Sequence, residues 1–288
     1  MTDLLTADLL RGWSLPLPAD GDKRVRGTVL VVGGSPQTPG AVVLAGLAAL
    51  RAGAGRLQIA TAAVAAPTVG VAMPEALVQG LPTTAVGGLA LPDDWGPLRT
   101  AASEADALLI GPGLADLDAT TRLTSQLLDH VSADTIVVID ALALAVLPSI
   151  GSRVGPSRGQ LVLTPNAQEI HAIAPGLGDD ELDRQAMAAA EATGAIVTLH
   201  GQVAAPDGRS WVAVGGGLGL GTSGSGDVLA GFAAGLGARC GDAAQAACWA
   251  AHLHGAAGDR LSARIGPVGF LAREIADEAP RILAALSS

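Results

Sequence analysis

Residues 221–231, GTSGSGDVLAG, are the stretch of this sequence best suited to chemistry. Their glycines let successive backbone N–H groups converge, and the apolar run that follows predicts a helix whose positive end faces the same point. Such a loop can hold a phosphate group without a lysine. Asp227 would then either cap the helix or, kept ionised by the helix N-terminus, act as a general base on a substrate hydroxyl. The loop alone favours neither role.

Two familiar nucleotide motifs are excluded by position or by composition. GLGTSG at 219–224 matches G-x-G-x-x-G, but a dinucleotide fingerprint follows the first strand of a βαβ unit. This one comes late in the chain and is followed only by predicted helix. The run VVGGSPQTPG, which follows an early apolar segment, lacks the Gly-Lys-Ser/Thr ending of a Walker A loop.

Other candidate residues each have a structural and a functional interpretation. In TPNAQE (164–169), Asn166 and Glu169 are three residues apart and would share a helical face. They form either an N-terminal cap with an acidic first turn or, if Glu169 orders Mg²⁺ through water, part of a metal site. Asp140 ends an apolar run and either caps the next turn or faces a site. His252 and His254 would point to different helix faces, which favours packing or capping over zinc binding.

Short β-branched runs alternate with alanine-rich helical segments, and these elements must position the candidates. The alternation predicts βαβ crossovers and an α/β fold whose mostly parallel sheet is covered on both faces. Ligands bind beyond the carboxyl ends of such strands, where Asp140, residues 166–169 and two glycine-rich turns lie. No composition break divides residues 1–288, which we expect to form one domain. Strands are predicted at 27–34, 56–61, 105–114, 135–141, 160–166, 195–201 and 210–216, and helices at 39–55, 121–131, 180–194 and from 228 onward.

Composition narrows the possible partners and the compartment. A net charge of −10 argues against nucleic acid as the main partner, because phosphate backbones require a basic surface. The only cysteines, Cys240 and Cys248, indicate a reducing compartment and no disulfide framework. The N-terminus lacks the features of a signal peptide, and the longest apolar helix candidate is too short for a bilayer. We therefore expect a cytoplasmic protein without a membrane partner.

These motifs, in this order, resemble the ADP/ATP-dependent NAD(P)H-hydrate dehydratases of the ribokinase-like superfamily. The resemblance runs from about Gly27 to Ala285. GSGD is shared with many ribokinase-like kinases, whereas its combination with PGA, GPGL and HGAAGD is far more specific. The resemblance implies a three-layer sandwich with a central, largely parallel sheet and helices on both faces. The segments that carry it are GTVLVVGGSPQTPGAVVLAGLAALRAGAGRLQIAT, MPEAL, LLIGPGL, VVIDALAL, LVLTPNAQE, GTSGSGDVLAG and HLHGAAGD.

The resemblance also implies a reaction. ADP or ATP would phosphorylate the ring hydroxyl of (6S)-hydrated NADH or NADPH, and phosphate would then leave to regenerate NADH or NADPH. Mg²⁺ would be the cofactor, and a homotetramer is common in the family. The implied site residues are Asp227 as catalytic base, Ala41, Gly113, Asn166 and Asp227 at the substrate, His200, Gly201, Gly224, Ser225 and Gly226 at the nucleotide and its phosphates, and Glu169 at the metal.

The sequence departs from the family pattern at three places, one of which is the asparagine-containing turn before GSGD, here GGGLGLG. The usual H-P-G-E is Asn166-Ala167-Gln168-Glu169, which instead is similar to the magnesium-ordering motif of ribokinase-like vitamin kinases. The usual L-K-G is Leu199-His200-Gly201, and the segment after it is about three residues shorter. Two alternatives therefore stay open: a vitamin or sugar kinase, and a catalytically silent nucleotide-binding homologue.

Overall fold

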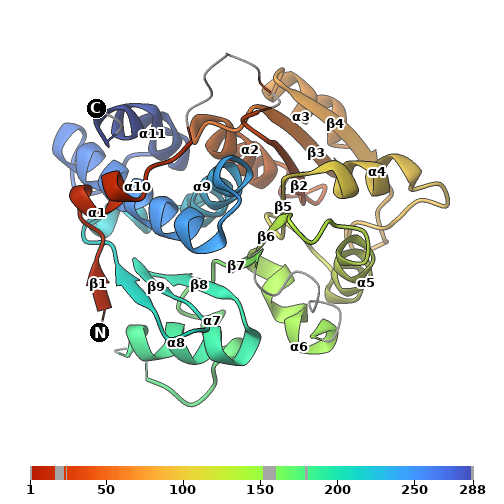
Figure 1. The fold of residues 1–288 in the computed structure, drawn as a ribbon. Helices are drawn as coiled ribbons and strands as arrows, with labels where there is room; N and C mark the ends of the chain where they lie inside the picture. Colours follow the sequence, from red (N-terminus) through yellow and green to blue (C-terminus); the bar gives the residue numbers. More distant parts are fainter. Residues whose placement is uncertain (1, 17–22, 24, 152–159, 179–180, 287–288) are drawn as a thin grey trace.

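One ten-stranded sheet forms the centre of the computed structural model, which describes residues 2–16, 23, 25–151, 160–178 and 181–286 (Figure 1). Seven neighbouring strands (β4, β3, β2, β5, β6, β7 and β8) run parallel to one another. Strand β9 is antiparallel to both its neighbours, β8 and β10. The predicted mostly parallel sheet is therefore confirmed. Across the sheet the order is β4 (Ala76–Leu81), β3 (Arg56–Ala62), β2 (Thr28–Val32), β5 (Ala107–Ile110), β6 (Ile136–Ile139), β7 (Leu161–Leu163), β8 (Ile196–Leu199), β9 (Gln202–Ala204), β10 (Ser210–Val212) and β1 (Thr2–Leu4).

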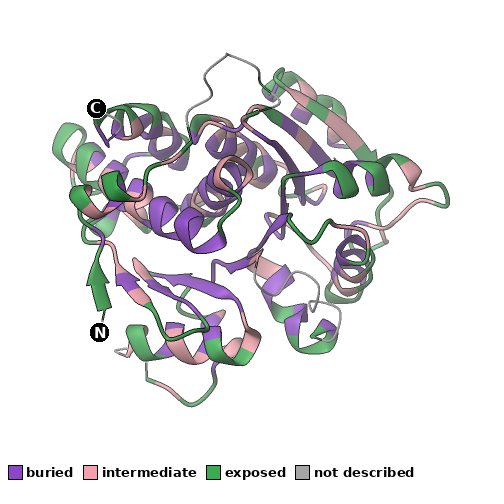
Figure 2. Ribbon diagram, viewed as in Figure 1, coloured by how far each residue is buried: buried purple, intermediate pink, exposed green. Residues whose placement is uncertain are grey.

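The central strands are apolar throughout because helices cover both faces of the sheet. In β2, Val29 and Val31 belong to one hydrophobic core, and Leu30 and Val32 to a second core on the opposite face. Figure 2 shows the resulting continuous burial of these strands. Small side chains let the helices that carry Ala45 and Gly231 pack in close contact. A Cβ added at Gly231 would lie only 2.2 Å from the Ala45 carbonyl oxygen. The alanine- and glycine-rich composition is thus what lets two helices approach closely.

Four long helices and two short ones pack with the first core, and several others pack with the second. The long helices of the first core are α2 (Gly40–Arg51), α9 (Ser225–Cys240), α10 (Ala243–Arg264) and α11 (Ala272–Leu286), and the short ones are α1 (Ala7–Gly12) and α3 (Ala66–Ala72). The second core includes α4 (Gly96–Glu104), α5 (Leu117–Leu128), the 3₁₀ helix η1 (Ala141–Val146), α6 (Leu147–Ile150), α7 (Ile170–Ile173) and α8 (Leu182–Thr193). The 3₁₀ helix η3 (Leu218–Leu220) precedes α9.

The sequence patterns missed several peripheral elements. Strands β1 and β4, at the two edges of the sheet, and β9, beside β8, were not predicted, nor were helices α1, α3, α4 and α6. Helix α5 begins at Leu117, four residues before the predicted start, because the Asp116 side chain accepts a hydrogen bond from the Ala119 N–H and caps it. The core strands and the long C-terminal helices agree with the prediction.

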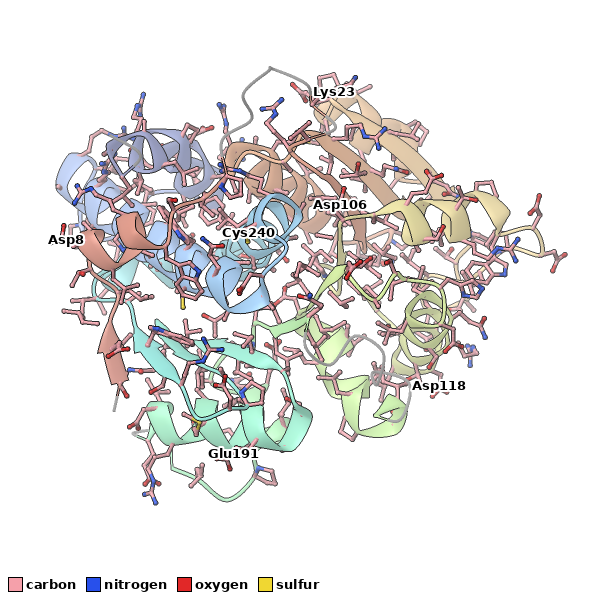
Figure 3. The ribbon with its side chains drawn as sticks, viewed as in Figure 1. Asp8, Lys23, Asp106, Asp118, Glu191 and Cys240 are labelled. Atoms are coloured by element: carbon pink, nitrogen blue, oxygen red, sulfur yellow. The ribbon has the colours of Figure 1, made fainter. Side chains whose placement is uncertain are left out.

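Many charged side chains lie on the exposed faces of the helices, although Glu278 on α11 is buried. Asp118 on α5 and Glu191 on α8 are examples at the periphery (Figure 3). In the part of the chain described, every helix is too short or too polar to cross a bilayer.

Candidate active site

The predicted anion loop leads directly into helix α9. Gly224 has a left-handed backbone (φ 87°) and precedes the first helical residue, Ser225. The Ser225 N–H donates to the Thr222 carbonyl at 3.2 Å, so the turn itself uses one of the three N–H groups expected to hold phosphate. Within the described ranges, the N–H groups of Gly224, Gly226 and Asp227 have no partner. These three groups are free to bind an anion at the helix N-terminus.

Asp227 lies in the first turn of α9 but does not cap it. Its half-buried carboxylate makes no hydrogen bond or ion pair with any described residue. Burial raises its pKa to about 6. A carboxylate with a raised pKa and no protein partner is suited to accept a proton from a ligand hydroxyl near neutral pH.

A row of polar residues crosses three neighbouring strands beneath Asp227. Leu163 pairs with Ile139 on one side and Val197 on the other, so the next residues, Asp140, Thr164 and Thr198, lie side by side. The Thr164 hydroxyl donates to Asp140 Oδ1 at 2.7 Å. The Asp140 side chain makes no cap bond to η1, and its carboxyl group is within range of the charge of Asp227.

Asp140 marks where three carboxylates converge. Burial raises the pKa of Asp140 to about 7, and the negative charges of Asp227 and Glu169 add to this increase. These residues come from three separate segments of the chain, so only the fold brings them near one another. Two of them, Asp140 and Asp227, have pKa values placed near neutrality, which is typical of acid–base sites.

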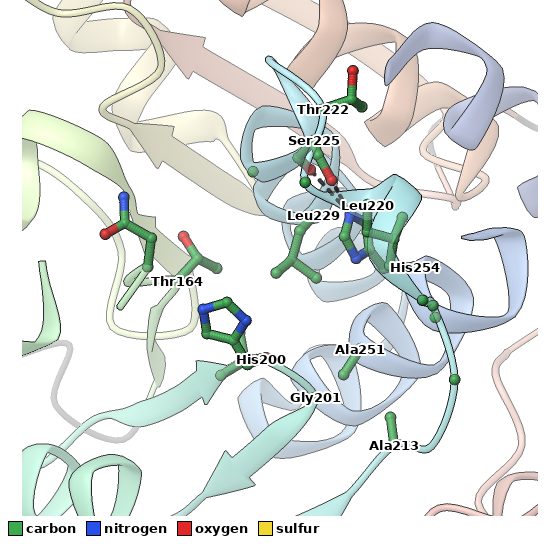
Figure 4. A pocket seen from close by; sticks show the side chains of 18 of the residues that line it. Thr164, His200, Gly201, Ala213, Leu220, Thr222, Ser225, Leu229, Ala251 and His254 are labelled. Carbon is green, nitrogen blue, oxygen red and sulfur yellow. Dashed lines mark hydrogen bonds between the residues drawn. The ribbon is translucent and has the colours of Figure 1, made fainter. Parts of the chain in front are cut away.

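A pocket of about 550 Å³ opens beside the anion loop (Figure 4). Its lining includes Asn166, His200, Gly201, Ser225 and Gly226, so five predicted site residues meet here. Gly224 and Asp227 adjoin this lining in the chain.

His200 and Gly201 form the two-residue turn between β8 and β9, with φ values of 47° and 82°. Turns of this kind require positive φ at both positions, which Gly201 adopts readily and His200 does not. The exposed imidazole lies at the pocket, where the family pattern has a lysine. The pocket therefore has in its wall an imidazole carried on a strained backbone.

Ala41 and Gly113 also meet, but in a second cluster outside this pocket lining. A Cβ at Gly113 (φ 66°) would lie 2.9 Å from Ala41 Cβ. The Thr38 hydroxyl donates to the Gly113 carbonyl at 2.8 Å and holds the two turns together. One turn further along α2, Leu44 packs against Gly224. Helix α2 thus joins this cluster to the anion loop.

Asn166 and Glu169 cap each other at the start of α7. Asn166 Oδ1 accepts from the Glu169 N–H at 2.9 Å, and Glu169 Oε2 accepts from the Asn166 N–H at 2.9 Å. This is the predicted capping arrangement. The described residues contain no group of three His, Cys, Asp or Glu side chains arranged to hold a metal. A water-mediated Mg²⁺ near Glu169 therefore stays a prediction.

Two residues of the HGAAGD motif shape the pocket, although the sequence interpretation gave them no site role: His254 lines it, and Asp259 holds a residue that does. His254 Nε2 lies 2.8 Å from the Ser225 hydroxyl oxygen. Asp259 Oδ1 accepts a hydrogen bond from the Gly216 N–H at 2.8 Å and so holds the glycine-rich loop 215–217. The available signal was the motif itself, but its partners lie 29 and 43 positions away.

Comparison with known proteins finds relatives that are similar in sequence over nearly the whole chain. A family profile described as NAD(P)H-hydrate dehydratase matches residues 29–281. The chain is 48% identical to the ADP-dependent (S)-NAD(P)H-hydrate dehydratase of Xanthomonas campestris pv. campestris, covering 97% of this chain and 95% of the relative. It is 38% identical to the bifunctional NAD(P)H-hydrate repair enzyme Nnr of Moorella thermoacetica, covering 97% of this chain but only 53% of that relative. The chain thus spans about half the length of this bifunctional protein.

Solved structures show the same fold. A ribokinase-like superfamily protein from Enterococcus faecalis superposes with a TM-score of 0.84 at 24% identity, covering 99% of this chain and 96% of the other, a likeness of fold alone. The ADP/ATP-dependent NAD(P)H-hydrate dehydratase from Bacillus subtilis, co-crystallised with ATP/Mg²⁺, superposes with a TM-score of 0.78 at 28% identity over 99% of both chains. The predicted ribokinase-like α/β sandwich is confirmed.

Proposed function

The chain belongs to the NAD(P)H-hydrate dehydratase family, and on that premise we propose that it is a lyase that uses ADP or ATP to dehydrate (6S)-NAD(P)H hydrate. The observation that supports this assignment is the unpaired Asp227 carboxylate beside the free N–H groups of Gly224 and Gly226. It places a base and an anion site at one helix terminus, which is what phosphoryl transfer to a hydroxyl requires.

In the first step, Asp227 accepts the proton of the ring hydroxyl while the hydroxyl oxygen attacks the terminal phosphorus of the nucleotide. With ADP the leaving group is AMP, and with ATP it is ADP. The N–H groups of Gly224 and Gly226 stabilise the negative charge on the transferring phosphoryl oxygens. The N-terminus of α9 adds its positive potential at the same point.

In the second step, the carbon–oxygen bond of the phosphorylated ring breaks and phosphate departs with the bonding pair. The adjacent ring carbon loses a proton to the departing phosphate or to water, and the double bond of NADH or NADPH forms. Phosphorylation makes this possible because phosphate is a far better leaving group than hydroxide. We propose that Ala41, Gly113 and Asn166 contact the hydrated nucleotide, and that His200 and Gly201 contact the adenine nucleotide.

Mg²⁺ is a further part of the proposal. Carboxylate oxygens are the donors this hard cation prefers, and it keeps most of its water ligands. Glu169 and Asp140 would hold such a hydrated ion, because both are carboxylates and the charge of Glu169 acts on Asp140. When bound, the ion would neutralise nucleotide phosphate charge. His200 has no carboxylate with which to bind the metal ion. We propose that it orients the nucleotide instead.

Incubation of the purified protein with the hydrate, Mg²⁺ and either ADP or ATP tests the reaction. We expect the absorbance of reduced nicotinamide to return, with one phosphate released per turnover. Asp227→Asn should retain nucleotide binding and lose turnover. Failure of the wild-type protein with both nucleotides would exclude the dehydratase assignment.

The same experiment separates the alternatives. A small-molecule kinase would transfer phosphate to an alcohol and leave a stable phosphoester, without any return of nicotinamide absorbance. A silent homologue would bind nucleotide, and neither wild type nor Asp227→Asn would turn over any substrate. The family profile and the relative at 48% identity are both NAD(P)H-hydrate dehydratases, so we rank the kinase second.

Three broader properties are also proposals. We propose one catalytic domain over residues 1–288, a homotetramer, and action in the cytoplasm, where nicotinamide nucleotides and adenine nucleotides are both abundant. Light scattering coupled to size exclusion should give four times the mass of the 28.4 kDa chain. A monomeric mass would overturn the tetramer without affecting the proposed chemistry.

A further inference from the structure

His254 on α10 contacts the first residue of α9 through a single ring nitrogen (Figure 4). Its Nε2 atom lies 2.8 Å from the Ser225 hydroxyl oxygen and 3.1 Å from the Ser225 carbonyl oxygen. Ser225 is only 5% exposed and lines the pocket, so its hydroxyl faces protein or ligand rather than bulk water.

The carbonyl contact determines which ring nitrogen carries the hydrogen. A carbonyl oxygen can only accept, so the 3.1 Å contact is a hydrogen bond only if His254 Nε2 carries a hydrogen and donates it. Burial lowers the pKa of His254 to about 4, so the ring is neutral near pH 7 and Nδ1 is bare. The Nε2–H is therefore shared between the carbonyl and hydroxyl oxygens of Ser225.

This arrangement leaves the hydrogen of the Ser225 hydroxyl without an acceptor. Its oxygen already accepts from His254, and in the described part of the chain no other group bonds to it. The free N–H groups of Gly226 and Asp227 belong to the same helical turn. All three donors would be satisfied by one anion seated at the helix N-terminus.

We infer that the Ser225 hydroxyl donates a hydrogen bond to the terminal phosphate of the nucleotide, and that His254 is the positioning residue that holds it in this donor role. The identity of the anion as a nucleotide phosphate rests on the proposed function. The donor role itself rests only on the contacts of His254. The backbone N–H of Ser225 cannot serve instead, because it already donates to Thr222.

Helix α10 sets the opposite wall of the pocket as well. Asp259 lies five residues after His254 and accepts from the Gly216 N–H. One helix therefore fixes both the start of α9 and the glycine-rich loop facing it. The first and last residues of HGAAGD therefore have different roles. His254 orients the Ser225 hydroxyl, which donates a hydrogen bond to phosphate, and Asp259 holds the glycine-rich loop.

Binding of ADP and AMP to matched variants tests the donor role. AMP lacks the terminal phosphate of ADP, so Ser225→Ala should weaken ADP binding by about 10-fold or more, as expected for a hydrogen bond to a charged group, and leave AMP binding within about twofold. Ser223→Ala, a neighbouring exposed serine, should change neither. Equal weakening of ADP and AMP by Ser225→Ala, or no weakening of ADP, would overturn the inference.

The positioning role of His254 has its own readouts. Nitrogen-15 NMR of the free protein should show hydrogen on Nε2 and none on Nδ1. His254→Ala should weaken ADP binding as Ser225→Ala does, the double variant should be no weaker than either, and His254→Gln, whose amide can donate, should recover most of the affinity. The opposite tautomer, or additive losses in the double variant, would contradict it.

Failure of this inference and failure of the proposed reaction can be told apart. If the wild-type protein binds ADP more tightly than AMP in this Ser225-dependent way but does not dehydrate the hydrate, the proposed reaction fails and this inference stands.

Discussion

The Thr164 hydroxyl donates a 2.7 Å hydrogen bond to Asp140 Oδ1, across two strands that end at the same edge of the sheet. This bond favours the ionised form of a carboxyl whose pKa burial and neighbouring charges raise to about 7. The hydrogen bond from Thr164 therefore offsets part of the electrostatic repulsion between Asp140 and the neighbouring carboxylates.

Thr164→Val should destabilise the protein more at high pH than at low pH. Above pH 7 Asp140 is ionised and the lost bond is one to a charged group, worth about 1.5–3 kcal/mol, whereas below pH 6 it is neutral and the loss is about 1 kcal/mol. Urea unfolding of both proteins at pH 5.5 and 8.5 measures the difference. Thr164→Ser, which keeps the hydroxyl, is the matched control; equal destabilisation at both pH values would contradict the expectation.

The pH dependence of turnover should report Asp227. Its pKa is raised to about 6, and a general base works only when ionised, so kcat/KM should fall about tenfold per pH unit below 6 and level off above about 7. The measurement is the initial rate of hydrate loss from pH 4.5 to 8.5, with unfolding monitored in parallel. A rate that stays constant from pH 5 to 7 would argue against Asp227 as the base.

His200→Ala should raise the KM for the nucleotide about 3- to 10-fold and leave kcat little changed, because the imidazole is expected to aid binding rather than chemistry. His200→Asn is the control for the turn, since Asn tolerates the left-handed backbone (φ 47°) that the position requires. His200→Lys, which restores the residue of the family pattern, should lower the KM. A change confined to kcat would contradict this assignment.

Gly113→Ala should impair the hydrate side of the site. The new Cβ would lie 2.6 Å from the Thr38 carbonyl oxygen and 2.9 Å from Ala41 Cβ, so the two turns must separate. We expect a rise in KM for the hydrate of about tenfold or more with ADP affinity unchanged. Gly208→Ala is the control, because it has a similar positive φ (89°) and nothing within 4 Å of the new Cβ. An equal effect in both variants would indicate backbone strain alone.

Much of the fold was predictable because it depends on local patterns. Apolar runs of strand length are buried on both faces, and helices begin after the glycines of residues 221–224 and end at Gly194 and Gly241, both in the left-handed conformation. The edge strands β1 and β4 escaped prediction for a physical reason: β1 is exposed throughout and β4 buries only its last residue, Leu81, so neither has the pattern of a strand buried on both faces. Their pairing depends on a neighbouring strand already in place.

The sequence by itself determined the chemistry at each position: a glycine-lined helix start with a carboxylate in its first turn, a histidine where a lysine is usual, and an Asn–Glu pair that caps itself. Only the tertiary structure decided what these groups face. It leaves Asp227 without a partner among the described residues, aligns Asp140 with Thr164, and brings His254 to Ser225 across 29 residues. Such contacts depend on strand register and helix packing, which arise from the whole core and leave no local signal in the chain.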